Sequence, residues 1–115
     1  MGVASKMWNK LTKKQLDLIP ELYSTEDTPA KEKKVYAKFF MGGMTWYVVE
    51  IDHKNYDRMF GYVYNASAPE MSEWGYISLK ELIGINIRGI EVDREIYGIA
   101  PRSPKRFGDI KEFNL

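Results

Sequence analysis

Cysteine is absent from this 115-residue sequence, and histidine occurs once, at His53. Without cysteine the chain forms no disulfide, thiolate zinc site, iron–sulfur cluster or cysteine nucleophile. The sequence also lacks a G-x-S-x-G elbow, a Walker loop, a G-x-G-x-x-G loop and an HExxH motif. A serine triad would need His53, which stands in a predicted turn without an obvious partner. These absences argue against the common hydrolase, nucleotide-binding and redox chemistries, and we expect no cofactor.

Long apolar runs are also missing. No stretch approaches the roughly 18 apolar residues of a membrane span, and the first fourteen residues hold no signal-peptide core. The lack of disulfides fits a reducing compartment. We therefore expect a cytoplasmic protein without a membrane partner, and the sequence leaves its oligomeric state open.

What is present suffices for one folded domain. Apolar residues make up 44% of the chain and aromatic residues 14%, which is too much for a disordered segment. A chain of this length forms a single domain with its own core. We divide it into a basic extension over residues 1–10, a domain over 11–100 and a loosely held tail over 101–115, which has two prolines and few apolar residues.

Strand signals dominate the middle of the chain. Segments rich in β-branched and aromatic residues alternate with short turn sequences such as Gly42-Gly43, and this pattern favours an antiparallel meander. The expected strands are Val35 to Met41, Met44 to Asp52, Arg58 to Asn65, Glu73 to Ile77 and, at an edge, Ile90 to Tyr97. In the second of them, alternation places Tyr47, Val49 and Ile51 on the face that we expect to form the core.

Two capping boxes predict short helices. Thr12 and Gln15 have the spacing of such a box, so a helix should begin at Lys13 and end before Pro20. Ser78 and Glu81 repeat the spacing, which predicts a second helix that stops at Gly84. The expected class is α+β: an antiparallel sheet of four to five strands with two short helices packed on one face.

Charge is unevenly distributed although the formal net charge is only +1. The two ends of the chain are basic, and the segment 50–95 is acidic. One reading is a lysine-rich surface that keeps the protein soluble. The alternative is a nucleic-acid-binding face that combines aromatic stacking with phosphate contacts. Its candidates are Lys10, Lys13, Lys14, Lys33, Lys34 and Arg106.

Carboxylates in or beside the strands suggest a second alternative, a metal-dependent hydrolase. Glu50 and Asp52 share a strand face, and Glu91 lies in the last expected strand. Hard cations such as Mg²⁺ bind such oxygens. Acids on the solvent face of an antiparallel sheet are nevertheless ordinary, so we assign no metal ligand and no catalytic residue.

The chain holds eight tyrosines, five phenylalanines and three tryptophans, many of them in neighbouring expected strands. Most should fill the core and pair across strands. The number exceeds what one sheet face needs, and rings left exposed would mark a contact surface. The residues expected to bind a protein on the open sheet face are Trp46, Glu50, Tyr62 and Trp74.

Several short motifs occur in an order that resembles a known family. They are Leu11 to Leu16 with Pro20, Leu22-Tyr23 and Thr25-Glu26, then Phe39-Phe40, Thr45-Trp46-Tyr47, Glu50, Phe60 to Val63, Trp74-Gly75-Tyr76, Ser78-Leu79, Glu81-Leu82, Ile90-Glu91 and Asp93. The series resembles a family catalogued as a domain of unknown function (twenty-nine fifty-eight), over roughly residues 11 to 100.

The resemblance implies a small single-domain protein of the kind carried on plasmids, integrative elements and phages. It implies no activity and no catalytic residues. Our leading hypothesis is a non-catalytic accessory protein of a mobile element that binds a host defence or DNA-processing protein.

Overall fold

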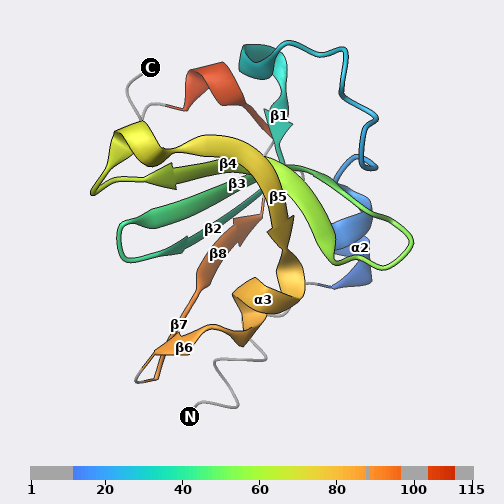
Figure 1. Cartoon of the computed structure of the whole chain (residues 1–115). Coiled ribbons are helices and arrows are strands. Elements are labelled where there is room, and N and C mark those ends of the chain that lie inside the picture. Colours follow the sequence, from blue (N-terminus) through green and yellow to red (C-terminus); the bar gives the residue numbers. More distant parts are fainter. Residues whose placement is uncertain (1–11, 88, 97–103, 111–115) are drawn as a thin grey trace.

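A computed structural model describes residues 12–87, 89–96 and 104–110 (Figure 1). Its centre is a five-stranded antiparallel sheet with the strand order β5-β4-β3-β2-β8. The strands are β2 (Ala37–Met41), β3 (Met44–Ile51), β4 (Arg58–Asn65), β5 (Glu73–Ser78) and β8 (Asp93–Ile96). The first four pair in chain order, which confirms the predicted meander. β8 pairs with β2 and forms the second edge of the sheet.

Shorter elements surround this sheet. The two-residue strands form separate pairs, β1 (Lys34–Val35) with β9 (Lys105–Arg106) and β6 (Asn86–Ile87) with β7 (Ile90–Glu91). Single 3-10 turns are η1 (Ala30–Glu32), η2 (Pro69–Met71) and η3 (Phe107–Asp109). The last predicted strand is therefore split at Val92 into β7 and β8, and its final residue, Tyr97, lies outside the described residues.

The helix α2 (Lys13–Asp17) begins where the capping box predicts. Thr12 Oγ1 accepts the Gln15 backbone N–H at 3.2 Å, and Gln15 Oε1 accepts the Thr12 N–H at 2.9 Å. These reciprocal bonds satisfy donors that a helix start leaves free.

The helix α3 (Leu79–Gly84) is capped from two directions. Ser78 Oγ accepts the Glu81 N–H at 3.2 Å, as the sequence predicts. In addition, Asp57 Oδ1 accepts the Lys80 N–H at 2.8 Å and the Ser78 hydroxyl at 2.9 Å. The bond from the Lys80 N–H, followed by that from Ser78, lowers the pKa of Asp57. The β3–β4 turn thus holds the start of α3.

Both helices cover the same face of the sheet. Leu16 of α2 and Leu79 and Leu82 of α3 belong to one buried cluster with sheet residues that include Val48 and Met59. This arrangement confirms the α+β class with its two short helices on one face. Neither helix, within the residues described, has the length and apolar character needed to cross a bilayer.

The strand β3 is buried on both faces, which corrects the prediction of a single core face. The register with β4 shifts between Val48 and Glu50, and this β-bulge leaves Val49 without a partner. Beyond the bulge the alternation is displaced, so Ile51 joins Val48 in the larger cluster. Tyr47 and Val49 belong instead to a smaller cluster on the opposite face.

Gly61 of β4 lies beside this bulge and allows a close approach of the two strands. A Cβ atom at this position would lie 1.9 Å from the Tyr47 carbonyl oxygen. Because such a contact is sterically impossible, a residue without a side chain is required here.

The smaller cluster is closed by the C-terminal segment. Phe107 and Ile110 are buried, and the Phe107 ring packs on Trp74 with ring centroids 4.7 Å apart. The Phe107 N–H also donates to the Lys33 carbonyl at 2.7 Å. Figure 1 shows η3 in red beside β1. The expectation of a loosely held tail therefore fails over residues 105–110, because one large aromatic side chain anchors them. Residues 1–10, 101–103 and 111–115 lie outside the described part.

Candidate functional site

A pocket of about 240 Å³ opens between the segment after α2 and the face of the sheet that carries the smaller cluster. Two exposed tyrosines, one buried acid and one buried lysine contribute to it. Its lining residues are Tyr23, Glu26, Lys33, Glu50, Phe60 and Tyr76.

Backbone pairing with the end of β3 positions the segment that carries Tyr23. The Ile51 N–H donates to the Pro20 carbonyl at 2.8 Å, and the Leu22 N–H donates to the Ile51 carbonyl at 3.1 Å. These bonds form a single parallel bridge between Glu21 and Ile51. The chain after Pro20 is thereby fixed against the sheet instead of continuing the helix.

The Glu50 carboxylate holds the turn that follows. The side chain is only 3% exposed, and its oxygens accept the backbone N–H groups of Tyr23 at 2.8 Å and of Thr25 at 3.1 Å. The Thr25 hydroxyl donates to the same carboxylate. A buried carboxylate requires such donors in place of water. Glu50 is therefore an acceptor committed to the turn.

Lys33 approaches the same turn from the other side. Its side chain is buried, and Nζ donates to the Thr25 carbonyl and to Thr25 Oγ1, the latter at 3.1 Å. Thr25 thus lies between a buried carboxylate and a buried ammonium group. These opposite charges offset one another across the turn, which leaves Glu26 as the exposed acid at the pocket.

Tyr23 adopts a strained backbone conformation. Its φ angle is +69°, in the left-handed region that non-glycine residues seldom occupy. A conformation of this kind persists only where surrounding contacts impose it. The hydrogen bond from its N–H to Glu50 is such a contact. In this conformation the Tyr23 residue is 52% exposed.

Tyr76 of β5 meets Tyr23 at the mouth of the pocket. The Tyr76 hydroxyl donates to the Tyr23 hydroxyl at 3.0 Å, and this bond raises the pKa of Tyr76. Tyr76 is 54% exposed. The Phe60 ring meets it edge-on at 5.6 Å, and the Arg58 guanidinium lies 5.0 Å from its ring centroid. The site therefore presents ring faces, ring edges and hydroxyl groups to a ligand.

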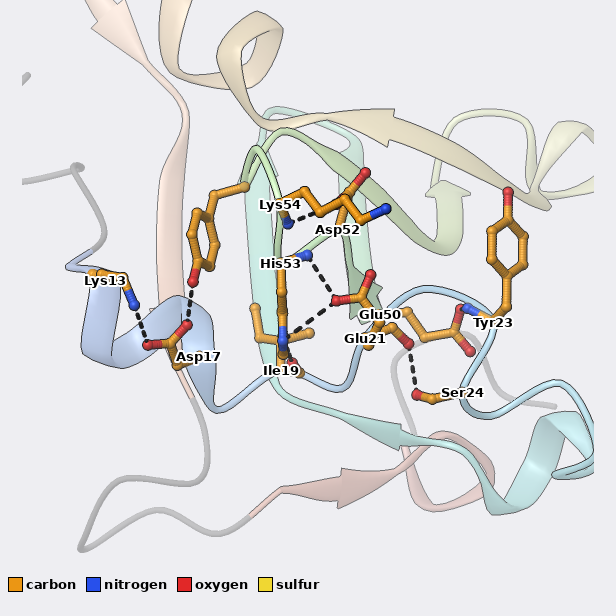
Figure 2. Close-up of polar contacts among 11 residues, drawn as sticks. Lys13, Asp17, Ile19, Glu21, Tyr23, Ser24, Glu50, Asp52, His53 and Lys54 are labelled. Carbon is orange, nitrogen blue, oxygen red and sulfur yellow. Dashed lines mark hydrogen bonds and ion pairs between the residues drawn. The ribbon is translucent and has the colours of Figure 1, made fainter.

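A second polar group lies near the end of β3 (Figure 2). His53 Nε2 is 2.6 Å from the Ile19 carbonyl oxygen, Nδ1 is 3.4 Å from Glu21 Oε2, and the His53 backbone N–H donates to that carboxylate at 2.9 Å. The Tyr56 hydroxyl donates to Asp17 Oδ1 at 2.6 Å. This bond, followed by one from Lys13, lowers the pKa of Asp17. These contacts tie α2 to the β3–β4 turn and have a structural role.

The four residues predicted to bind a protein do not form one exposed surface. Trp46 packs against the larger cluster, whereas Tyr62 and Trp74 pack against the smaller one on the other face. All three are half-buried, and Glu50 is buried. Of these four, Glu50 alone lines the pocket, and there it supports the turn.

The residues predicted to bind nucleic acid are also separated. Lys10 lies outside the described part, Lys13 and Lys14 are on α2, Lys33 is buried, and Lys34 pairs in register with Arg106. Figure 1 shows α2 well away from β1.

Acids surround Arg106 within the small β1–β9 sheet. Its guanidinium binds Asp109 at 3.0 Å and Glu32 at 3.0 Å, and both contacts raise its pKa, that with Asp109 more. The described candidates therefore lie in two separate places, on α2 and around the β1–β9 pair, and Lys33 among them is buried.

The carboxylates of the hydrolase alternative are engaged elsewhere. Asp52 Oδ1 accepts the Lys54 N–H at 2.7 Å, while Glu50 holds the turn at Thr25. The side chain of Glu91 lies outside the described part. In the portion of the chain that is described, no three His, Asp or Glu side chains converge as metal ligands.

Sequence reasoning missed Tyr23, Glu26 and Tyr76 as site residues. A usable signal exists for Tyr23 and Glu26, because they stand in a polar segment between Pro20 and Pro29, and functional side chains often lie in such connections. The position of Tyr76 opposite Tyr23 depends on the tertiary fold, and no local pattern marks it.

Comparison with known proteins provides no further guide. No protein-family model, curated protein or solved structure matches the chain. The resemblance to the family of unknown function stays a prediction.

Proposed function

We propose that this chain is an interaction protein that binds another protein through the pocket at Tyr23 and Tyr76. The observation that carries the proposal is the strained, exposed Tyr23, which the buried Glu50 holds against Tyr76. Exposed tyrosines at the mouth of a pocket are typical anchors of protein contacts, because they bury large area with few rotatable bonds.

Backbone strain supports a role in binding. A non-glycine residue at positive φ costs free energy, and such residues concentrate at binding and catalytic sites. A glycine would relieve the strain at position 23 but would remove the ring. The tyrosine ring is thus present at position 23 at the cost of an unfavourable backbone conformation.

The chemistry of the pocket favours a basic side chain of the partner. Phe60 and Tyr76 supply aromatic rings, and the Glu26 carboxylate lies at the rim. A guanidinium or ammonium group over an aromatic ring, near a carboxylate, gains both cation–π and Coulomb attraction. Arg58 already occupies this kind of position over Tyr76 within the chain.

The biological setting rests on the resemblance alone. We propose an accessory role on a mobile genetic element, with a host defence or DNA-processing protein as the partner. The geometry supports contact with a protein, and the resemblance supports this choice among proteins.

Site-specific photo-crosslinking tests the proposal. A photoreactive phenylalanine at Tyr23 should crosslink one defined protein in the native host, whereas the same group at exposed Lys54 should not. Glu26→Gln should reduce the yield from position 23, because it removes the rim carboxylate. Equal crosslinking from both positions, or none from Tyr23 at several salt concentrations, would contradict the proposal.

A further inference from the structure

The strand β5 forms one edge of the central sheet. The Leu79 N–H, directly after β5, donates inward to the Asp57 carbonyl. Hydrogen-bonded pairs alternate along an antiparallel ladder. The backbone N–H and C=O groups of Ile77 and Gly75 therefore also point toward β4, whereas those of Trp74 and Tyr76 point away from the sheet. Within the described part of the chain, nothing hydrogen-bonds to that outer side.

This edge has few of the features that usually prevent strands from pairing with other molecules, and its one charged residue, Glu73, stands at the first position. β5 (Glu73–Ser78) contains no lysine and no proline, and its six residues pair with β4 in unbroken register. Natural sheets protect such edges with charged residues, proline or bulges. An edge with so little protection, next to exposed aromatic residues, is suited to strand addition.

The sequence of β5 is complementary to itself. An antiparallel pair with its two-fold axis at Gly75 sets the two copies of this glycine opposite each other and Tyr76 opposite Trp74 of the second copy. Trp74 and Tyr76 then exchange backbone hydrogen bonds, and their rings continue one aromatic row across both sheets. Glu73 faces Ile77 of the second copy, so no like charges are opposed.

We propose that two copies of this chain pair through their β5 edges into one continuous antiparallel sheet. The formal net charge of +1 imposes little repulsion between the copies. This inference does not rest on the proposed function, because it concerns the backbone edge of β5, although the Tyr76 side chain also lines the pocket.

Charge substitution at the two-fold axis gives a specific test. A Cβ at Gly75 meets no atom within 4 Å, so Gly75→Glu and Gly75→Lys should leave the single chain folded. In a dimer of either variant, two like charges at position 75 lie opposite each other, so self-association should weaken about fivefold. In an equimolar mixture of the two variants, a glutamate can lie opposite a lysine, so association should recover. Sedimentation velocity over a range of concentrations measures all four samples, with thermal unfolding as the folding control.

Backbone donors provide the second test. Tyr76→Pro removes an outward N–H, which an edge strand tolerates, and Tyr76→Ala removes the ring but keeps the donor. The proline variant should associate about 30-fold more weakly than the alanine variant, since two intermolecular hydrogen bonds are lost per dimer. If Tyr76→Pro fails to fold, hydrogen exchange of the wild-type protein gives the test. The backbone amides of Trp74 and Tyr76 should exchange slowly only at high protein concentration.

A wild-type chain that sediments as a monomer at every concentration would overturn the proposal, and would leave the edge to a strand of another protein. Self-association that is unchanged in both Gly75 variants would overturn it as well. Loss of crosslinking at Tyr23 would instead count against the proposed function, so the two failures are distinguishable.

Discussion

The buried carboxylate of Glu50 accepts the backbone N–H of Tyr23 at 2.8 Å, across 27 positions of sequence. This bond joins the bulged strand β3 to the turn that presents the Tyr23 ring. The bulge places Glu50 next to Val49 on the pocket side of the sheet, where its oxygens reach the turn. The conformation of the pocket thus depends on one residue that ordinary strand alternation would place on the opposite face.

Replacement of Glu50 tests this dependence. Glu50→Ala should lower the free energy of unfolding by about 3 kcal/mol, because buried donors at Tyr23 and Thr25 lose a charged acceptor. Glu50→Gln should cost about half as much, since one carbonyl oxygen remains. Urea denaturation measures both variants, with Glu26→Gln as an exposed control. An alanine variant as stable as that control would show that the turn does not need Glu50.

The approach of β4 to β3 predicts opposite outcomes for two paired glycines. Gly61→Ala should cost about 3 kcal/mol or prevent folding, because its Cβ would overlap the Tyr47 carbonyl oxygen. Gly75 pairs with Gly61 in the ladder, yet a Cβ there meets nothing within 4 Å. Gly75→Ala should therefore change stability by no more than about 0.5 kcal/mol. Equal thermal unfolding midpoints for the two variants would contradict the described register.

The burial of Phe107 predicts that the C-terminal segment contributes to stability. Phe107→Ala should cost about 3 kcal/mol, because it removes a ring that is 3% exposed between Tyr62 and Trp74. Met71→Ala also truncates a large apolar side chain, but one that is 70% exposed, and should stay within about 0.5 kcal/mol. If urea denaturation showed that the two variants lose similar free energies of unfolding, Phe107 would lie outside the core.

The helix cap from Asp57 predicts a pH dependence. Because folding lowers the pKa of Asp57, its carboxylate stabilises the fold above the ordinary value near 3.8, and this stabilisation is lost as the pH falls through the lowered pKa. Asp57→Asn should be less stable than the wild type by about 1 kcal/mol at pH 7. The difference should shrink below pH 4. Parallel stability curves for the two proteins from pH 7 to pH 2 would refute this account.

Local sequence signals predicted the secondary structure well. The reciprocal bonds of Thr12 and Gln15 and the start of α3 after Ser78 depend on residues three positions apart. The meander follows from short turns between β-rich segments. Such features are specified by neighbours in sequence, so they can be recognised before the fold is known.

The tertiary features could not be predicted in the same way. The bulge at Val49 inverts the expected face of Ile51, and it lies where β4 approaches β3 closely at Gly61. Phe107 stands in a stretch that is otherwise polar, so its burial depends on a space that Tyr62 and Trp74 create. The pocket combines residues from the connection between α2 and β1 with residues from the strands β3, β4 and β5, and no single spacing encodes it.

The affinity of Tyr23→Gly for the crosslinked partner tests the central claim most directly. Glycine adopts positive φ without strain, so the free energy of unfolding of this variant should exceed that of Tyr23→Ala by about 1 kcal/mol. Both variants lack the ring. We predict that isothermal titration calorimetry gives a Kd at least about tenfold weaker than the wild-type value, as for the loss of a contact anchor. An unchanged Kd in this well-folded variant would contradict the assignment of Tyr23 and its pocket as the binding surface.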